Sequence, residues 1–376
     1  MKKLKLYIIA GEASGDLHGS NLMKNLTAEN PNIEFRFWGG DKMKQQGGTL
    51  VKHISDLAFM GFLEVIKNIK TILNNIRFCK ADIATFQPDA LLLIDYPGFN
   101  LRIAEWAKQK GIKVYYYVSP QVWAWKQSRV HKIKKCVDEL YVILPFEKDF
   151  YKKFDYEVHY LGHPLLDAVA DFRSSIVDKQ LIYSENNLSD KPIIALLPGS
   201  RKQEVSVKLP IMLEAVRSFD SYQVIIAGAP SLAPEFYQQF IKESDKIIFG
   251  KTYDILEIAE AAVVTSGTAT LETALFHVPQ VVCYKSSAFS YHIAKRLVKI
   301  KFISLVNLIL NKEAVKELIQ QDCNPTLIQK EIGKILVGGD HRESMLQDYK
   351  ELQQLLGAGG ASKKIAHAML KTINQA

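Results

Sequence analysis

Short, almost purely apolar runs alternate along this chain with longer segments in which apolar residues recur every three or four positions. A strand buried on both faces of a parallel sheet forms a continuous apolar run, and the longer periodicity is that of an amphipathic helix. The pattern therefore predicts an α/β protein with parallel sheets. The predicted strands lie at residues 4–10, 34–38, 90–94, 113–118, 137–142, 157–160, 193–197, 223–227, 247–249, 261–264 and 280–284.

The alternation of strands and helices pauses once, between residues 171 and 190. This segment is polar and has no clear periodicity, which is typical of a linker between domains. A length of 376 residues also favours two domains over one. We predict a first domain at residues 1–170 and a second at 190–344.

In the second half, two loops after predicted strands carry groups suited to a phosphate. Residues 265–272 pass from a strand into a helix through Ser266, Gly267 and Thr268, so backbone N–H groups and the helix dipole favour an anion there. Residues 199–201 follow another strand, and their arginine adds a permanent bidentate cation. Together the loops predict a nucleotide-diphosphate site, although residues 265–272 alone are equally typical of an ordinary capped helix.

The first half also carries polar side chains directly after predicted strands. Glu12 and Asp16 follow the first strand among glycines that are four residues apart, which is not the dinucleotide-binding spacing. We expect an acceptor-binding or catalytic loop, with a plain turn as the alternative. Asp95 ends a central strand, where open α/β sheets place their chemistry, and helix capping is the alternative.

Residues 60–76 form an apolar helical stripe with basic edges. The stripe comprises Phe62, Val65, Ile66, Ile69, Ile72, Leu73 and Ile76, and the basic residues beside it include Lys67 and Lys70. A helix facing the core is the ordinary interpretation. A helix lying in a membrane interface is the alternative, because Leu63 widens the apolar surface beyond one stripe.

Composition narrows the classes of protein. A net charge of +8 indicates an anionic partner, such as nucleotide phosphates, nucleic acid or a membrane surface. The four cysteines are scattered without a CxxC pair, which argues against a zinc site and fits a reducing compartment. We expect neither a signal peptide, since acidic residues interrupt the first apolar run, nor a membrane span. The predicted location is cytoplasmic.

Seven motifs in order resemble the lipid-A-disaccharide synthase family (glycosyltransferase family 19) over nearly the whole chain. They are AGEASGD at 10–16, GG at 39–40, MGFLEV at 60–65, IDYPGFN at 94–100, SPQVWAW at 119–125, LPGSR at 197–201 and TSGTATLE at 265–272. The resemblance implies a GT-B fold, in which two Rossmann-like domains face each other across a cleft. It also implies that the C-terminal segment, about 345–376, packs back on a first domain, its own or a partner's.

The family implies an inverting hexosyl transfer in lipid A biosynthesis. UDP-2,3-diacylglucosamine would donate its sugar to the 6-hydroxyl of 2,3-diacylglucosamine 1-phosphate (lipid X), giving a β-1,6-linked lipid A disaccharide 1-phosphate and UDP. No cofactor and no metal are implied, because GT-B enzymes resemble one another in holding the leaving diphosphate with a helix N-terminus and cations.

The family's functional residues map onto matching positions of this chain. Asp95 matches the essential aspartate and is the first candidate for the general base, with Glu12 and Asp16 as alternatives. Gly98 departs from the family pattern, in which a second acid is common, and this places more weight on Asp95. The implied UDP-sugar residues are Ser200, Arg201, Ser266, Gly267, Thr268, Glu272 (as the ribose-binding acid) and Asn307.

Both implied substrates carry acyl chains, so we expect a landing surface on the cytoplasmic face of the inner membrane. Its predicted contacts are Phe62, Leu63, Ile66 and Ile69. A UDP-GlcNAc 2-epimerase is the rival enzyme. A nucleic-acid-binding protein is the rival outside enzymes, suggested by the basic residues 129–135 but lacking a recognisable binding motif. The oligomeric state stays open, a homodimer included, and so does the acyl-chain length.

Overall fold

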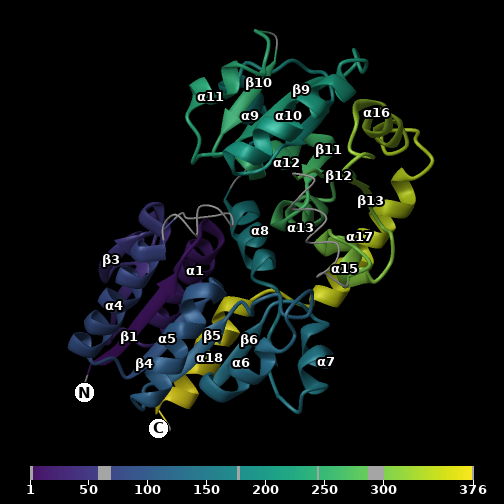
Figure 1. Ribbon diagram of the computed structural model, residues 1–376. Helices are drawn as coiled ribbons and strands as arrows, with labels where there is room; N and C mark the ends of the chain where they lie inside the picture. Colours follow the sequence, from purple (N-terminus) through teal and green to yellow (C-terminus); the bar gives the residue numbers. More distant parts are fainter. Residues whose placement is uncertain (1–2, 58–68, 176–177, 244, 287–299, 375–376) are drawn as a thin grey trace. The chain divides into compact units, whose positions relative to one another are not determined.

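The structure is a computed structural model that describes residues 3–57, 69–175, 178–243, 245–286 and 300–374. It divides into two compact units (Figure 1): residues 1–167 with 358–376, and residues 168–357. Each unit is built on its own parallel sheet with helices on both faces, which confirms the predicted α/β fold.

The first unit contains a seven-stranded sheet in the order β3-β2-β1-β4-β5-β6-β7. Its strands are β1 Leu4–Ala10, β2 Ile33–Gly39, β3 Thr49–His53, β4 Ala90–Ile94, β5 Lys113–Tyr117, β6 Glu139–Val142 and β7 His159–Tyr160. The central strands β1 and β4 pair in parallel with Ala10 opposite Ile94, so the loops that follow them leave the same edge of the sheet.

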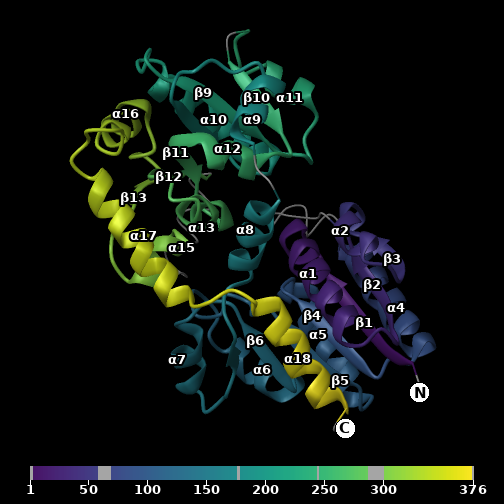
Figure 2. The same ribbon diagram turned by 180° about the vertical axis from the view of Figure 1, so that it is seen from behind.

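Helices cover both faces of this sheet. They are α1 Ala13–Glu29, α2 Asp41–Gln45, the short 3-10 helix Ile54–Leu57, α4 Ile69–Phe86, α5 Pro97–Gln109, α6 Arg129–Cys136, α7 Glu147–Lys152 and α18 Ala361–Asn374. Helices α1 and α18 lie side by side and share one apolar core with the strands beneath them (Figure 2). Asp167 fixes the start of α18 by accepting the backbone N–H groups of Gly360 at 2.5 Å and Ser362 at 2.9 Å.

The second unit contains a six-stranded sheet in the order β10-β9-β8-β11-β12-β13. Its strands are β8 Ile193–Leu197, β9 Gln223–Gly228, β10 Lys246–Phe249, β11 Ala259–Thr265, β12 Gln280–Tyr284 and β13 Lys316–Ile319. Its helices are α9 Lys179–Glu185, α10 Lys202–Val216, α11 Pro234–Gln238, α12 Thr252–Ile258, α13 Thr268–Leu275, α15 Leu305–Leu310, α16 Pro325–Gly333 and α17 Arg342–Leu356. Helix α10 packs with α16, whereas α13 packs with α15 and α17.

Two segments differ from the sequence-based expectation. The polar segment 171–190, predicted as a linker, is largely helical: it contains the end of α8 (Pro164–Ser174) and all of α9, and the division between the units falls after residue 167. The C-terminal segment 345–376 holds two helices, of which α17 belongs to the second unit and only α18 to the first. Polar exposed helices produced the linker-like composition.

None of the helices in the described part of the chain is long and apolar enough to span a bilayer.

Candidate functional site

Asp95 directly follows the carboxyl end of β4 and has a backbone conformation that few non-glycine residues adopt. Asp95 and Tyr96 are consecutive left-handed residues, with φ of +44° and +48°. Such a conformation is costly for residues other than glycine and persists only where the surroundings hold it. The Asn100 side chain donates to the Asp95 carbonyl at 2.8 Å, and the Tyr116 hydroxyl donates to the same carbonyl at 2.5 Å. The neighbouring elements therefore fix Asp95 in place.

The Asp95 carboxyl group has a pKa close to neutral pH. Burial first, and then the negative charge of Glu12, raise this pKa from 3.8 to about 7. Glu12 is the N-cap residue of α1, directly after β1, but its side chain does not cap the helix. The loop between β1 and α1 lies close against Tyr96, because a Cβ added at Gly11 would collide with that ring. The structure thus brings Asp95 and Glu12 together, and a carboxyl group of this pKa suits general base catalysis.

Asp16 has a different environment from Asp95. Its carboxylate is buried and accepts three backbone N–H groups at the start of α2, from Gly40 at 2.7 Å, Lys42 at 3.1 Å and Met43 at 3.0 Å. These bonds satisfy donors that a helix N-terminus leaves unpaired. The structure therefore gives Asp16, a predicted catalytic candidate, the role of holding α2 against α1.

Two buried histidines and one buried glutamate of the first unit lay outside the predicted site. Burial lowers the pKa of His18 to about 4 and that of His163 to about 3. Burial raises the pKa of Glu147 to about 8, although its carboxylate accepts the backbone N–H of Leu144 at 2.9 Å. The sequence offered little indication of Glu147, because it is a single acidic residue after a short apolar segment. Its hydrogen-bond partner, Leu144, is only three residues away.

In the second unit, the loop after β8 carries the predicted arginine. Gly199 has φ of +115°, and Arg201 is the N-cap residue of α10. Glu204 accepts the backbone N–H of Ser200 at 3.2 Å through Oε2, and its Oε1 lies 3.3 Å from Nη1 of Arg201. The loop therefore presents a guanidinium and a backbone N–H beside one another, which is the donor pair that a phosphate needs.

The loop after β11 leads into α13 through Ser266, Gly267 and Thr268. Ser266 is tied on both sides: its N–H donates to the Cys283 carbonyl at 3.0 Å and its hydroxyl to the Ile303 carbonyl at 3.0 Å. Gly267 is the N-cap residue, with φ of 157° and ψ of −162°, a region that is essentially restricted to glycine. Apart from its chain neighbours, no described residue has an atom within 4 Å of a Cβ added at Gly267.

Glu272 lies in the second turn of α13. The Tyr253 hydroxyl donates to its Oε1 atom at 2.9 Å, and burial raises its pKa. This is the only hydrogen bond that the Glu272 side chain makes among the described residues, so the carboxylate keeps acceptor capacity for a hydroxyl of a ligand.

Asn307, predicted near the donor, is wholly buried and fully hydrogen-bonded. Its Nδ2 donates to the Val315 carbonyl at 2.8 Å and to Glu317 at 2.9 Å, while its Oδ1 accepts from the N–H groups of Ala314 and Val315. Glu317 also accepts the N–H of Ile303, whose carbonyl binds Ser266. Asn307 therefore supports the Ser266 loop through its neighbours, and its side chain has no bond left for a ligand.

Of the predicted membrane contacts, Phe62, Leu63 and Ile66 lie outside the described residues. Ile69 begins α4 and is 53% exposed. Two further apolar side chains of α4, Leu73 and Phe78, are 44% and 50% exposed. This helix presents more apolar surface to its surroundings than a helix that faces only a core.

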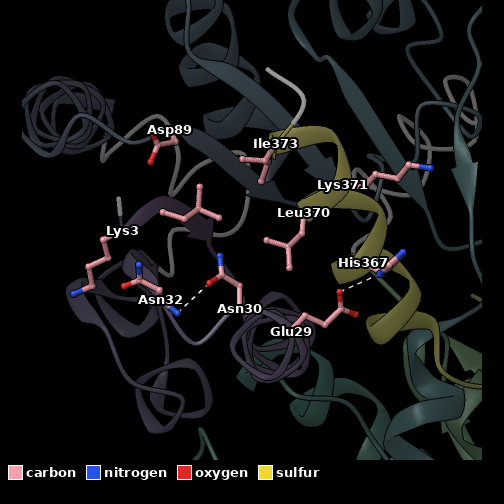
Figure 3. A pocket seen from close by; sticks show the side chains of 10 residues that line it. Lys3, Glu29, Asn30, Asn32, Asp89, His367, Leu370, Lys371 and Ile373 are labelled. Carbon is pink, nitrogen blue, oxygen red and sulfur yellow. Dashed lines mark hydrogen bonds and ion pairs between the residues drawn. The ribbon is translucent and has the colours of Figure 1, made fainter. Parts of the chain in front are cut away.

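A separate groove of about 990 Å³ lies at the end of the first sheet where strands β1 and β4 begin, away from Asp95 (Figure 3). Its lining includes Leu4 at the start of β1, Asp89 just before β4, and α18, where His367 pairs with Glu29 at 3.2 Å. Open parallel sheets bind ligands at the carboxyl ends of their strands, so this groove is not a candidate for the chemistry.

Comparison with known proteins gives one consistent family. The family model for lipid-A-disaccharide synthetase matches residues 6–371. A lipid-A-disaccharide synthase from Syntrophus aciditrophicus is 40% identical and covers 100% of this chain and 99% of its own length. Proteins of the same name from Trichlorobacter lovleyi and Coxiella burnetii are 36% and 37% identical, with 97–99% of this chain and 98% of each relative covered.

Solved structures show the same fold at low sequence identity. A putative UDP-N-acetylglucosamine 2-epimerase from Listeria monocytogenes has a TM-score of 0.71 at 15% identity and covers 100% of this chain and 98% of its own. The calicheamicin glycosyltransferase CalG4 has a TM-score of 0.62 at 13% identity, with 100% and 99% covered. At these identities the likeness shows the fold alone, and it confirms the GT-B architecture.

Proposed function

The chain belongs to the lipid-A-disaccharide synthetase family, and from this premise we propose that its two sheets carry the two halves of one glycosyl transfer. Lipid-A-disaccharide synthases are hexosyltransferases of lipid A biosynthesis that act on lipid-linked sugars. The donor we propose is UDP-2,3-diacylglucosamine. The acceptor is 2,3-diacylglucosamine 1-phosphate, whose 6-hydroxyl attacks.

The donor half lies on the second unit. Backbone N–H groups at Gly267 and Thr268 and the guanidinium of Arg201 bind the diphosphate, and Glu272 binds a ribose hydroxyl. Two features support this assignment: the glycine-only backbone at the N-terminus of α13 and the adjacent donors at Ser200 and Arg201.

The acceptor half lies on the first unit, with Asp95 as the general base. Asp95 removes the proton of the acceptor 6-hydroxyl while that oxygen attacks the anomeric carbon and the bond to UDP breaks with inversion. The observation that carries this role is the raised pKa of Asp95, about 7, on a backbone held in the left-handed region. Burial is the main cause of that raised pKa, and the charge of Glu12 contributes to it. Asp16 and Asn307 are supporting residues in this account.

The negative charge that develops on the leaving diphosphate is stabilised by Arg201 and the α13 N-terminus, which are arranged before reaction. No step in this account requires a cofactor.

We further propose that the protein acts as a peripheral protein on the cytoplasmic face of the inner membrane, from which both acylated substrates come. The exposed apolar side chains of α4, with Phe62, Leu63 and Ile66 before it, form the landing surface together with Lys67 and Lys70. Exposed apolar residues beside lysines are what an anionic interface attracts.

Sugar transfer by the purified protein tests this function. The protein is incubated with UDP-2,3-diacylglucosamine and 2,3-diacylglucosamine 1-phosphate in detergent, and the acylated disaccharide and UDP are measured together. We expect one UDP for each disaccharide formed. Epimerisation of UDP-GlcNAc without disaccharide formation would instead support the rival enzyme class.

A further inference from the structure

Glu204 holds the two groups that the proposed donor site assigns to a phosphate. Its Oε2 atom accepts the Ser200 backbone N–H at 3.2 Å, and its Oε1 atom lies 3.3 Å from Nη1 of Arg201. Gly199 is part of the same arrangement, because a Cβ added there would collide with Oε2. Carboxylate oxygens therefore lie where phosphate oxygens are expected to bind.

The ordinary interpretation of Glu204 is helix capping. In a capping box, the glutamate in the first turn accepts the backbone N–H of the N-cap residue. Here the accepted N–H belongs to Ser200, one residue before the N-cap Arg201, and the carboxylate also takes the Arg201 side chain. Capping explains neither the second contact nor the charge found one turn further along the helix.

That charge is Lys208, which follows Glu204 by four residues on α10 and is only 2% exposed. Burial lowers its pKa, and the Glu204 carboxylate opposes this effect. Residues four apart on a helix are neighbours, so Glu204 lies between Arg201 on one side and Lys208 on the other.

Lys208 makes no hydrogen bond and no ion pair within the described part of the second unit. The remaining residues of that unit, 176–177, 244 and 287–299, contain no aspartate or glutamate. None of them can therefore supply a carboxylate. A buried ammonium group that makes no hydrogen bond and no ion pair is costly, and it gains from any arrangement that brings an anion closer to it.

Building on the proposed donor site, we propose that Glu204 is an internal stand-in for the donor's diphosphate and that Lys208 is its alternative partner. When a nucleoside diphosphate binds, its oxygens take the Ser200 N–H and the Arg201 guanidinium. The Glu204 carboxylate then turns to Lys208, because two anions at one guanidinium repel each other. The exchange keeps Arg201 paired before binding and Lys208 paired after it, so Glu204 and Lys208 set the affinity for the donor.

Calorimetric titration with UDP tests the exchange. Glu204→Gln keeps an acceptor for the Ser200 N–H but removes the competing charge, so we expect it to bind UDP about two- to fivefold more tightly. Lys208→Met removes the alternative partner, so we expect binding to weaken about two- to fivefold. In the double variant Glu204→Gln, Lys208→Met, the loss of Lys208 should cause no further change in UDP affinity. No carboxylate remains at position 204 that Lys208 could pair with.

The control variants are Glu214→Gln on the exposed side of α10 and Lys330→Met on α16, and both should bind UDP as the unaltered protein does. Thermal unfolding of every variant reports on folding. If Lys208→Met does not fold, Lys208→Arg replaces it and should keep the unaltered affinity, while the Glu204→Gln result stands alone.

Two results overturn the inference alone. One is UDP affinity that is unchanged or weaker in Glu204→Gln while the unaltered protein binds UDP, which leaves Glu204 as a cap. The other is an equal Lys208→Met penalty with and without the Glu204 carboxylate, which means that Lys208 acts on the ligand or the fold directly. Failure of the unaltered protein to bind UDP overturns the donor site itself, and this inference with it.

Discussion

At the scale of single residues, the candidate site is defined by how many hydrogen bonds each carboxylate already accepts from the protein itself. The sequence placed Glu12, Asp16 and Asp95 after predicted strands; Glu12 and Asp95 directly follow β1 and β4, and Asp16 lies in the first turn of α1. The sequence could not show that Asp16 binds the N–H groups of residues 40, 42 and 43, because that contact joins segments 24 to 27 residues apart. Asn307 is a similar case, since its partners at 314, 315 and 317 come from β13 and the segment just before it. Only hydrogen bonds between segments distant in sequence show which predicted residues support the structure and which are left for catalysis or binding.

The pH dependence of transfer follows from the interaction of Glu12 with Asp95. Because a base works when deprotonated, kcat/KM should rise with pH through about 7, where Asp95 loses its proton. Glu12 disfavours the Asp95 carboxylate, so Glu12→Gln should lower the pKa of Asp95 and move the acid limb of the profile to lower pH. The measurement is kcat/KM against pH for both proteins. An acid limb that stays in place in Glu12→Gln would remove Asp95 as the titrating base.

The same group makes a prediction about stability. The folded-state pKa of Asp95, about 7, lies above its ordinary value of 3.8. Its contribution to stability is therefore fully present below about pH 4 and is lost as pH rises through 7. Asp95→Asn should raise the free energy of unfolding at pH 8, by on the order of 2 kcal/mol after allowance for partial exposure, and change it little at pH 4. Denaturant unfolding at the two pH values measures this, and a Glu34→Gln variant, at a half-exposed carboxylate on β2, serves as the control. An equal effect at both pH values would contradict the assigned pKa.

At the scale of elements, the strands were predictable because both faces of a central parallel strand are buried. The strands that escaped prediction, β3 and β13, lie at sheet edges and carry polar residues such as Lys52 and Glu317. The opposite error occurred at 171–190, where polar composition suggested a linker but an Asp178 cap begins helix α9. Polar composition thus reports exposure in both cases, and it does not by itself distinguish an edge strand, an exposed helix and a linker.

The region around the start of α4 carries the membrane prediction. Replacing Phe62 and Ile66 by serine should reduce flotation with vesicles of phosphatidylglycerol and phosphatidylcholine, and leave thermal unfolding nearly unchanged. Lys70→Gln should reduce binding by about 1 kcal/mol, and only with anionic vesicles. Leu181→Ser on α9 is the matched control, because Leu181 is 52% exposed in the second unit. Full flotation of the Phe62, Ile66 double variant would refute this landing surface.

At the scale of the whole molecule, each unit contributes a different capability. The first unit presents the Asp95 carboxyl group, with a pKa near neutrality. The second presents the backbone N–H groups at the start of α13, the Arg201 guanidinium, and Glu272 hydrogen-bonded to a tyrosine. The order of motifs along the chain was sufficient to predict the family and the fold. The competition at Arg201 was not predictable in this way, because it depends on where the Glu204 and Lys208 side chains lie.

The most direct test of this division of labour is a comparison of Asp95→Asn with Arg201→Ala in single-turnover transfer and in UDP titration. We predict that Asp95→Asn slows transfer about 100-fold or more while binding UDP as the unaltered protein does, because only the base is lost. Arg201→Ala should weaken UDP binding as well as transfer. A near-unaltered rate of transfer in Asp95→Asn would contradict the account.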